Sequence, residues 1–152
     1  DPKFIARRML IFASEDIGNA DPYALTLATS AFTAIDYIGM PEATLILSQT
    51  ATYLASCPKS NASYIAISKA KQDVNENPPF DVPLHLRNAP TKLMKDLNYG
   101  KEYKYAHDFE NNFTEQQYLP DELKDKVYYE PSENGMEAKF KKRLIELWKK
   151  RK

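Results

Sequence analysis

The stretch Ser14-Glu15-Asp16-Ile17-Gly18-Asn19-Ala20-Asp21-Pro22 decides the fold, because it ends one apolar helix and starts the next within a few residues. Gly18 suits the left-handed residue that follows a helix end. Asp21-Pro22 is a helix start, with an N-cap aspartate followed by a first-turn proline. The sequence therefore predicts a tight joint between two helices at this point.

Four helices are predicted around this joint, and together they form a first region, 1–78. Apolar residues recur at three- and four-residue steps from 24 to 38, which is the helix period. The predicted helices follow Asp1-Pro2, Asp21-Pro22, Pro41 and Ser60, and paired prolines end the last one, which runs from Asn61 to Glu76. Loops of roughly two to five residues make consecutive helices antiparallel neighbours or tight corner pairs.

Small residues are abundant in these helices, as in Ala28-Thr29-Ser30-Ala31. They let helix backbones approach closely, either inside a monomer core or across a contact between subunits, and both alternatives stay open. The single cysteine, Cys57, cannot form an internal disulfide. It is predicted to be a small buried apolar group, as in a protein from a reducing compartment.

Residues 79–131 change character, since prolines and aromatic residues are frequent and the helix period is weak. A short helix is predicted from Lys92 to Leu97 and a turn of helix from Pro120 to Lys124, with a short hairpin as a further element. The aromatic content is too high for a disordered linker. We predict an ordered, extended, aromatic-rich arm that packs on the helical core.

The last region, 132–152, is predicted to be an amphipathic basic helix that Ser132 caps. Its other face carries Lys and Arg, which suit the C-terminal end of the helix dipole. Its apolar stripe consists of Met136, Phe140, Leu144, Leu147 and Trp148. The predicted fold class is therefore mainly all-α: one domain with a helical bundle, an irregular arm and a C-terminal amphipathic helix.

The charges balance, with 21 basic and 21 acidic residues, so the whole chain is not a polyelectrolyte that must bind nucleic acid. Residues 133–152 nevertheless hold eight basic against three acidic residues, and residues 101–130 hold four against eight. No signal peptide and no apolar run of about 18 residues is present, and we expect a cytoplasmic protein without membrane contact. The missing initiator methionine suggests a piece of a longer protein.

No motif for catalysis, cofactor binding or metal binding is found. Four widely separated glycines exclude a P-loop and a dinucleotide fingerprint, and two histidines with one cysteine cannot form a typical zinc site. For His107-Asp108, a structural hydrogen-bonding histidine is favoured over an acid–base pair. For Glu15-Asp16, helix-end capping and an ion pair with Arg7 or Arg8 are favoured over chemistry.

Basic residues give a weak signal for nucleic-acid binding. They could face phosphate groups while nearby aromatic rings stack on bases, although a solvated helix face is the simpler interpretation. The C-terminal helix could instead lie on a membrane surface, but docking on its own core is favoured. The candidates for DNA contact are Lys59, Lys69, Arg87, Lys92 and Lys95.

Several strings in this chain resemble the C-terminal part of the MgsA/RarA family (replication-associated recombination protein A), AAA+ ATPases related to the Werner helicase interacting protein. The resemblance covers about residues 4 to 131. It is carried by the strings ASEDIG (13–18), ADP (20–22), IGMPE (38–42), PKSN (58–61), VPLHLRNAPT (82–91), YKYAHD (103–108) and QQYLP (116–120). The family-motif positions, to which we assign structural roles, are Asp16, Gly18, Asp21, Pro22, Gly39, Pro41, Arg87, Asn88, Pro90 and His107.

The resemblance implies a helical domain similar to clamp-loader collars that assembles the protein into a homotetramer. It implies a missing N-terminal domain that binds ATP and Mg and hydrolyses ATP in a DNA-dependent way, so this piece should be non-catalytic and without cofactor. It further implies a nucleoid-associated protein that acts at replication forks, DNA ends and gaps in recombination and repair, with DNA and single-stranded-DNA-binding protein as partners. The alternative is a module that binds nucleic acid or docks on that protein.

Overall fold

The computed structural model describes residues 1–148, and within them the chain forms six α-helices, several shorter helical turns and no β-strand. The all-helical prediction is thereby confirmed. The contacts divide the chain into two compact units: 1–70 with 128–146, and 71–127 with Leu147 and Trp148. In the described range no helix is long and apolar enough to cross a membrane.

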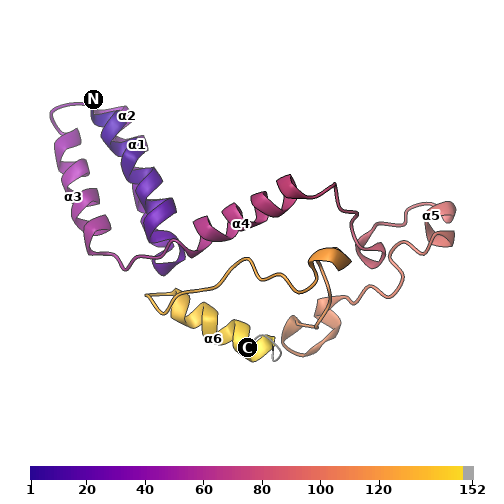
Figure 1. The fold of residues 1–152 in the computed structure, drawn as a ribbon. Coiled ribbons are helices and arrows are strands. Elements are labelled where there is room, and N and C mark those ends of the chain that lie inside the picture. The colour runs from indigo at the N-terminus through magenta and orange to yellow at the C-terminus, as the bar shows by residue number, and fades with distance from the viewer. Residues whose placement is uncertain (149–152) are drawn as a thin grey trace. The chain divides into compact units, whose positions relative to one another are not determined.

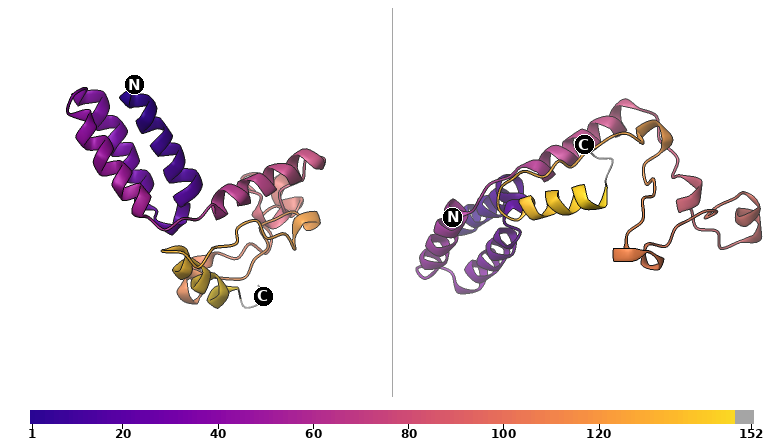
Figure 2. Two further views of the ribbon diagram at one scale, coloured as in Figure 1. Left: turned by 60° about the vertical axis from the view of Figure 1, so that its left-hand side comes forward. Right: turned by 90° about the horizontal axis from the view of Figure 1, so that it is seen from below.

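Three helices lie side by side in the first unit (Figures 1 and 2): α1 (Pro2–Phe12), α2 (Tyr23–Ile38) and α3 (Ala43–Ser56). The predicted cap of α1 is confirmed, because the Asp1 carboxylate accepts a 2.9 Å hydrogen bond from the backbone N–H of Lys3. A π-helical turn, Ala13–Ile17, continues α1 as far as Gly18. The N-terminus of α1 therefore lies at the same end of this bundle as the loop between α2 and α3.

Small side chains build the core between these helices. On α2 the residues that face inward are spaced by three or four positions, which places alanines where the helices come closest. The buried residues of the bundle are Ala6, Ala13, Ile17, Ala20, Ala24, Ala28, Ala31, Ile35, Ala43, Thr50, Leu54 and Cys57. Of the two predicted uses of small residues, close packing inside the unit is thus confirmed for the alanines. The predicted burial of Cys57 is confirmed as well.

The fourth helix, α4 (Ala62–Glu76), begins in the first unit and has no fully buried side chain. Its predicted cap is confirmed: the Ser60 hydroxyl accepts a 3.2 Å hydrogen bond from the backbone N–H of Ala62. One side of the helix meets the extended segment at 130, where Lys69 pairs with Glu130 at 3.1 Å. The opposite side leaves Tyr64 and Ile67 exposed.

The last helix, α6 (Glu137–Leu147), begins later than predicted. Ser132 does not cap it, because Gly135 takes a φ of +54° and breaks the helical path between the two. The Ser132 hydroxyl accepts instead from the backbone N–H of Asn134, at 3.1 Å, inside the turn before the helix. The predicted positions 149–152 of this helix lie outside the described residues.

The second unit is irregular, with short α5 (Lys92–Asp96) and single helical turns at Leu84–Leu86, Ala106–Asp108, Glu110–Asn112 and Asp121–Leu123. The predicted short helix and the predicted turn after Pro120 are confirmed. The predicted hairpin is wrong: among the described residues none pairs as a strand, because local turn bonds occupy the backbone groups near 105–113. The aromatic side chains make pairwise contacts such as Phe113 with Trp148, without forming one cluster in the range described.

Candidate functional site

Asp21 holds together the joint between the first helices. Its carboxylate accepts hydrogen bonds from the phenol of Tyr53 at 2.7 Å, from the thiol of Cys57 at 3.4 Å and from the backbone N–H of Tyr23 at 3.1 Å. The hydrogen bond to Asp21, together with burial, raises the pKa of Tyr53 to about 12, so the phenol stays neutral and donating. Asp21 thus ties the start of α2 to the end of α3.

The turn before Asp21 approaches the linker between α3 and α4 closely. The backbone N–H of Ser60 donates to the carbonyl of Asp16 at 2.8 Å. A Cβ on Gly18 would lie 2.7 Å from the Ser60 carbonyl oxygen, so a side chain at this position would collide with the linker. Asp16 and Gly18 therefore have structural positions. The backbone carbonyl of Asp16 binds the linker, and the absence of a side chain at Gly18 lets the linker approach.

The ion pair expected between Glu15 or Asp16 and Arg7 or Arg8 is wrong: none forms in residues 1–148. Two helical turns, about 10 Å of rise, separate the arginines from the carboxylates, which is too far for a direct pair. The Asp16 side chain is exposed. Within residues 1–148 neither carboxylate forms an ion pair.

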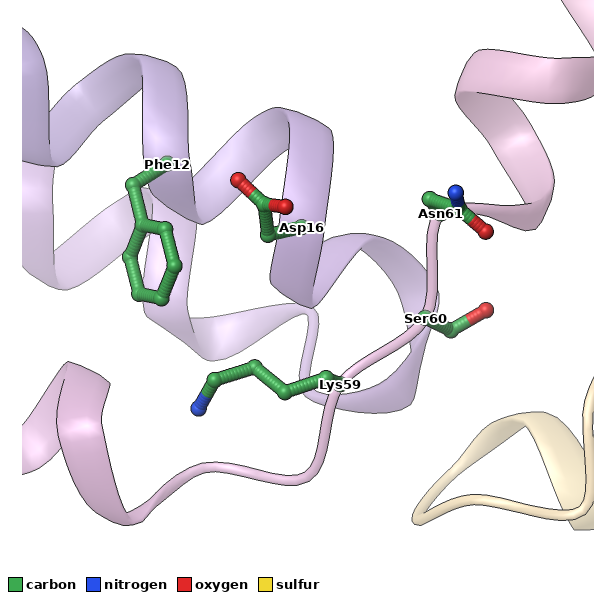
Figure 3. Close-up of a pocket in the computed structure, with 5 residues that line it drawn as sticks. All are labelled: Phe12, Asp16, Lys59, Ser60 and Asn61. Carbon is green, nitrogen blue, oxygen red and sulfur yellow. The ribbon is translucent and has the colours of Figure 1, made fainter.

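An open hollow of about 370 Å³ lies beside this joint, lined by Phe12, Asp16, Lys59, Ser60 and Asn61 (Figure 3). The Lys59 ammonium is directed at the end of α3, where it donates to the carbonyls of Leu54 at 2.8 Å and Cys57 at 2.6 Å. It also lies 5.4 Å from the centre of the Phe12 ring. Lys59 is thus a helix C-terminal cap, and the hollow has no cation left for an anionic ligand.

A buried carboxylate anchors the C-terminal segment of the first unit. Glu137 has no exposed surface, and it accepts from the phenol of Tyr129 at 2.8 Å and the backbone N–H of Ser132 at 2.9 Å. Burial raises the pKa of Glu137, but hydrogen bonds from Ser60, Ser132 and Tyr129 outweigh it and hold the pKa below its ordinary value. Asn19 donates to the Tyr129 oxygen at 3.3 Å and so connects this network to the turn after α1.

The loop before α6 is bound both to the turn after α1 and to the linker between α3 and α4. The backbone N–H of Met136 donates to the carbonyl of Ala20 at 2.8 Å, and the side-chain amide of Asn134 donates to the carbonyl of Lys59 at 2.8 Å. Sequence reasoning missed this anchor, because Glu137 looks like any acidic residue in a first helical turn. Gly135, which interrupts the predicted helix, was the available signal.

The candidate DNA contacts divide between the two units, with Lys59 and Lys69 in the first and Arg87, Lys92 and Lys95 in the second. Lys59 and Lys69 belong to the first unit, and each is engaged, the first with helix-end carbonyls and the second with Glu130. Arg87 is half-buried and engaged as well, as it donates to the Val82 carbonyl at 2.6 Å. Its other partners are the phenol of Tyr99 at 3.2 Å and the carboxylate of Asp81 at 3.4 Å. Lys92 and Lys95 are exposed on α5 and form no ion pair in the range described.

The remaining family-motif positions lie in turns. Pro22 precedes α2, Gly39 and Pro41 form the loop between α2 and α3, and Asn88 and Pro90 are exposed before α5.

His107 is exposed, with its ring centre 5.1 Å from that of Tyr105. In the part of the chain that the structure describes it forms no hydrogen bond, so the hydrogen-bonding role predicted for it is wrong. Groups of three or more potential metal ligands are also absent from residues 1–148.

The outer surface of α2 and α3 has an unusual composition. From 22 to 56 the sequence contains two charged residues, Asp36 and Glu42. Asp36 pairs with Lys3 at the edge that faces α1. Tyr37, 83% exposed, and Leu45, 72% exposed, are the two most exposed large apolar side chains of the residues described. We name this surface the uncharged face; its outward positions include Thr26, Thr33, Tyr37, Leu45, Gln49 and Thr52.

Comparison with known proteins gives consistent matches. The family described as "MgsA AAA+ ATPase C terminal" matches residues 1–148. The chain is 49% identical over 148 residues to "Replication-associated recombination protein A" of Haemophilus influenzae, covering 97% of this chain and 33% of that protein. It is 47% identical over 145 residues to the protein of that name from Escherichia coli K12, covering 95% and 32%.

A eukaryotic relative matches too: "ATPase WRNIP1" of Dictyostelium discoideum is 46% identical over 133 residues, covering 86% of this chain and 15% of that protein. The chain thus spans about a third of the length of the replication-associated relatives. What matches is their C-terminal domain, and the nucleotide-binding part of the AAA+ ATPases lies outside these 152 residues.

Proposed function

The chain belongs to the family of MgsA AAA+ ATPase C-terminal domains, and we propose that it is the module through which such an ATPase assembles into a homotetramer. One observation carries this proposal: the first unit exposes large apolar side chains that a monomeric domain would be expected to bury. Phe4, Ile5, Tyr37, Met40 and Leu45 are all exposed around one end of the three-helix bundle. Clustered exposed apolar groups of this kind mark interaction surfaces.

We further propose the setting in which this assembly works. The relatives' name, replication-associated recombination protein A, supports a role of the whole protein in replication-fork maintenance, recombination and repair. In this proposal a separate AAA+ domain binds ATP with Mg and hydrolyses it in response to DNA. The partners of the whole protein are then DNA at forks, ends or gaps and the single-stranded-DNA-binding protein, while the present chain supplies the contact between copies.

Multi-angle light scattering of the 152-residue chain across a hundredfold range of concentration tests the assembly. The expected result is a mass that rises with concentration toward four times the 17.5 kDa of the single chain. A mass of one chain at every concentration would remove the proposal. Low and high salt should give similar association, because the surface in question is largely uncharged.

A nucleic-acid-binding module is the second candidate, and one observation favours it. Lys92 and Lys95 are exposed on α5, and the nearby sequence exposes Lys101, Tyr103 and Tyr105. Positive charge with aromatic rings is what single-stranded nucleic acid requires of a protein. Fluorescence anisotropy with single-stranded and forked DNA at low salt tests it: salt-dependent binding that Lys92→Ala and Lys95→Ala weaken would support this module, and no binding would exclude it.

A further inference from the structure

We propose that one copy of the chain contacts another through the uncharged face of α2 and α3. This inference rests on the proposed self-association and names the surface that performs it. The face combines solvent exposure, helical regularity and lack of charge, and it carries the two most exposed large apolar residues, Tyr37 and Leu45. Depletion of charge at the centre of a contact is the compositional mark of protein interfaces.

The distribution of charge distinguishes this face from the exposed outer sides of α1 and α6. The outer side of α1 carries Arg7 and Arg8, and the outer side of α6 carries Lys142 and Arg143, all of them exposed. In a two-fold contact each surface meets its own copy, so a basic surface would bring like charges together. The uncharged face meets its copy without that penalty.

The same lack of charge identifies a second copy as the occupant. Nucleic acid and acidic peptides are recognised through cations, and the segment 22–56 contains none. Its two acidic residues are Asp36, which pairs with Lys3 beside α1, and Glu42, which precedes α3. A partner that is itself uncharged over two helices fits this face, and the chain itself supplies such a partner.

The shape of the face suits a contact between helices. Thr26, Thr33 and Tyr37 recur at seven- and four-residue steps on α2, and Leu45, Gln49 and Thr52 recur at four- and three-residue steps on α3. Both sets form stripes along their helices, and the short threonines let another helix approach closely. Tyr37 and Leu45 then act as the large side chains that fill the contact, since tyrosine is favoured at such anchor positions.

Introducing charge at the face tests the inference. Thr33→Arg and Leu45→Arg place a cation on each helix of the face, and Ile67→Arg is the matched control because Ile67 is exposed on the outer side of α4. All three positions are exposed in the single chain, so each variant should keep the wild-type far-UV circular dichroism. Sedimentation velocity should show dissociation constants at least about tenfold higher for the two face variants and unchanged for Ile67→Arg.

The outcomes distinguish this inference from the proposed self-association on which it rests. If the wild-type chain associates and both face variants keep its mass at each concentration, the contact lies elsewhere and the inference is overturned while self-association stands. If Ile67→Arg alone makes the chain dissociate, the inference is overturned in the same way. A wild-type chain that stays monomeric would remove the assembly function itself.

Discussion

The phenol of Tyr129 donates a 2.8 Å hydrogen bond to the carboxylate of Glu137, a charged side chain with no exposed surface. No cation pairs with this carboxylate in the part of the chain described. A buried charge without a counter-ion is tolerated only when hydrogen bonds satisfy it. The segment from 128 to 137 is therefore fixed to the helical bundle by a network that must stay complete.

Removing the carboxylate should destabilise the fold. Glu137→Ala leaves the Tyr129 hydroxyl and the Ser132 N–H buried without an acceptor, and we expect it to cost about 3 kcal/mol. Glu137→Gln should cost about 1–2 kcal/mol, because its amide nitrogen donates where the carboxylate accepted. Urea unfolding at one fixed protein concentration measures both. Glu146, exposed near the end of α6, provides the control: Glu146→Gln should change the free energy of unfolding by less than about 0.5 kcal/mol. Equal losses for all variants would contradict the role of Glu137.

Acid should weaken the fold through the same residue. The pKa of Glu137 is held below its ordinary value in the folded chain, while the unfolded chain has the ordinary value of about 4.3. Its stabilising contribution is then fully present above that value and is lost as the pH falls toward the folded pKa. Urea midpoints between about pH 6 and pH 3 should decrease less steeply for Glu137→Gln than for the wild type. Parallel curves would show that other carboxylates carry the acid sensitivity.

Two glycines with positive φ angles should respond differently to alanine. Gly39 has a φ of +72° with nothing within 4 Å of an added Cβ, so Gly39→Ala meets backbone strain alone, of about 1–3 kcal/mol. At Gly135, with a φ of +54°, an added Cβ would overlap the Ala20 carbonyl oxygen and lie 2.7 Å from Pro58. Gly135→Ala should therefore lose clearly more stability in thermal unfolding. Equal losses would mean that the loop before α6 does not approach the bundle as closely as described.

The helices of the first region could be predicted from the sequence because local signals mark their ends. Asp1, Gly18 and Ser60 have the predicted cap or end roles, and each role depends on residues within a few positions. Glu137 could not be found in this way. Its partner Tyr129 belongs to an extended segment, and the network continues to Asn19, 110 residues away from that tyrosine, so its burial is a property of the tertiary fold.

The sequence also could not show which small residues of α2 form the uncharged face. Ala28 and Ala31 are buried while Thr29 and Ser30 between them are exposed, although all four are small residues that favour the same close packing. Which of them face a core depends on the positions of α1 and α3. Composition therefore predicted that small residues serve packing, and only the structure separates those used inside the unit from those left outside.

Cys57 should react slowly with thiol reagents. It is 8% exposed, and burial together with its hydrogen bond to Asp21 raises the pKa of the thiol, which lowers the fraction of reactive thiolate. At about pH 8 the native chain should react with a disulfide reagent at least about tenfold more slowly than the urea-unfolded chain. Asp21→Asn should speed the native reaction, because it weakens an acceptor of the thiol proton. A native rate equal to the unfolded rate would show that the joint between α2 and α3 opens readily.

Tyr53 and Tyr129 should ionise unusually late in alkali. The hydrogen bond to Asp21 raises the pKa of Tyr53 to about 12, and burial raises that of Tyr129 to about 12. Because both folded values exceed the unfolded value of about 10, these groups stabilise the fold fully below about pH 10, and the contribution is lost as the pH rises toward 12.

Absorbance at 295 nm during an alkaline titration measures the number of tyrosines that ionise above about pH 11. Tyr53→Phe should remove part of this late absorbance change while keeping the ring beside Tyr23, whose centre lies 5.9 Å away. Tyr23→Phe is the matched control: it changes the other ring of this pair and should leave the late change in place. A late phase of the same size in Tyr53→Phe would mean that the phenol does not donate to Asp21 in solution.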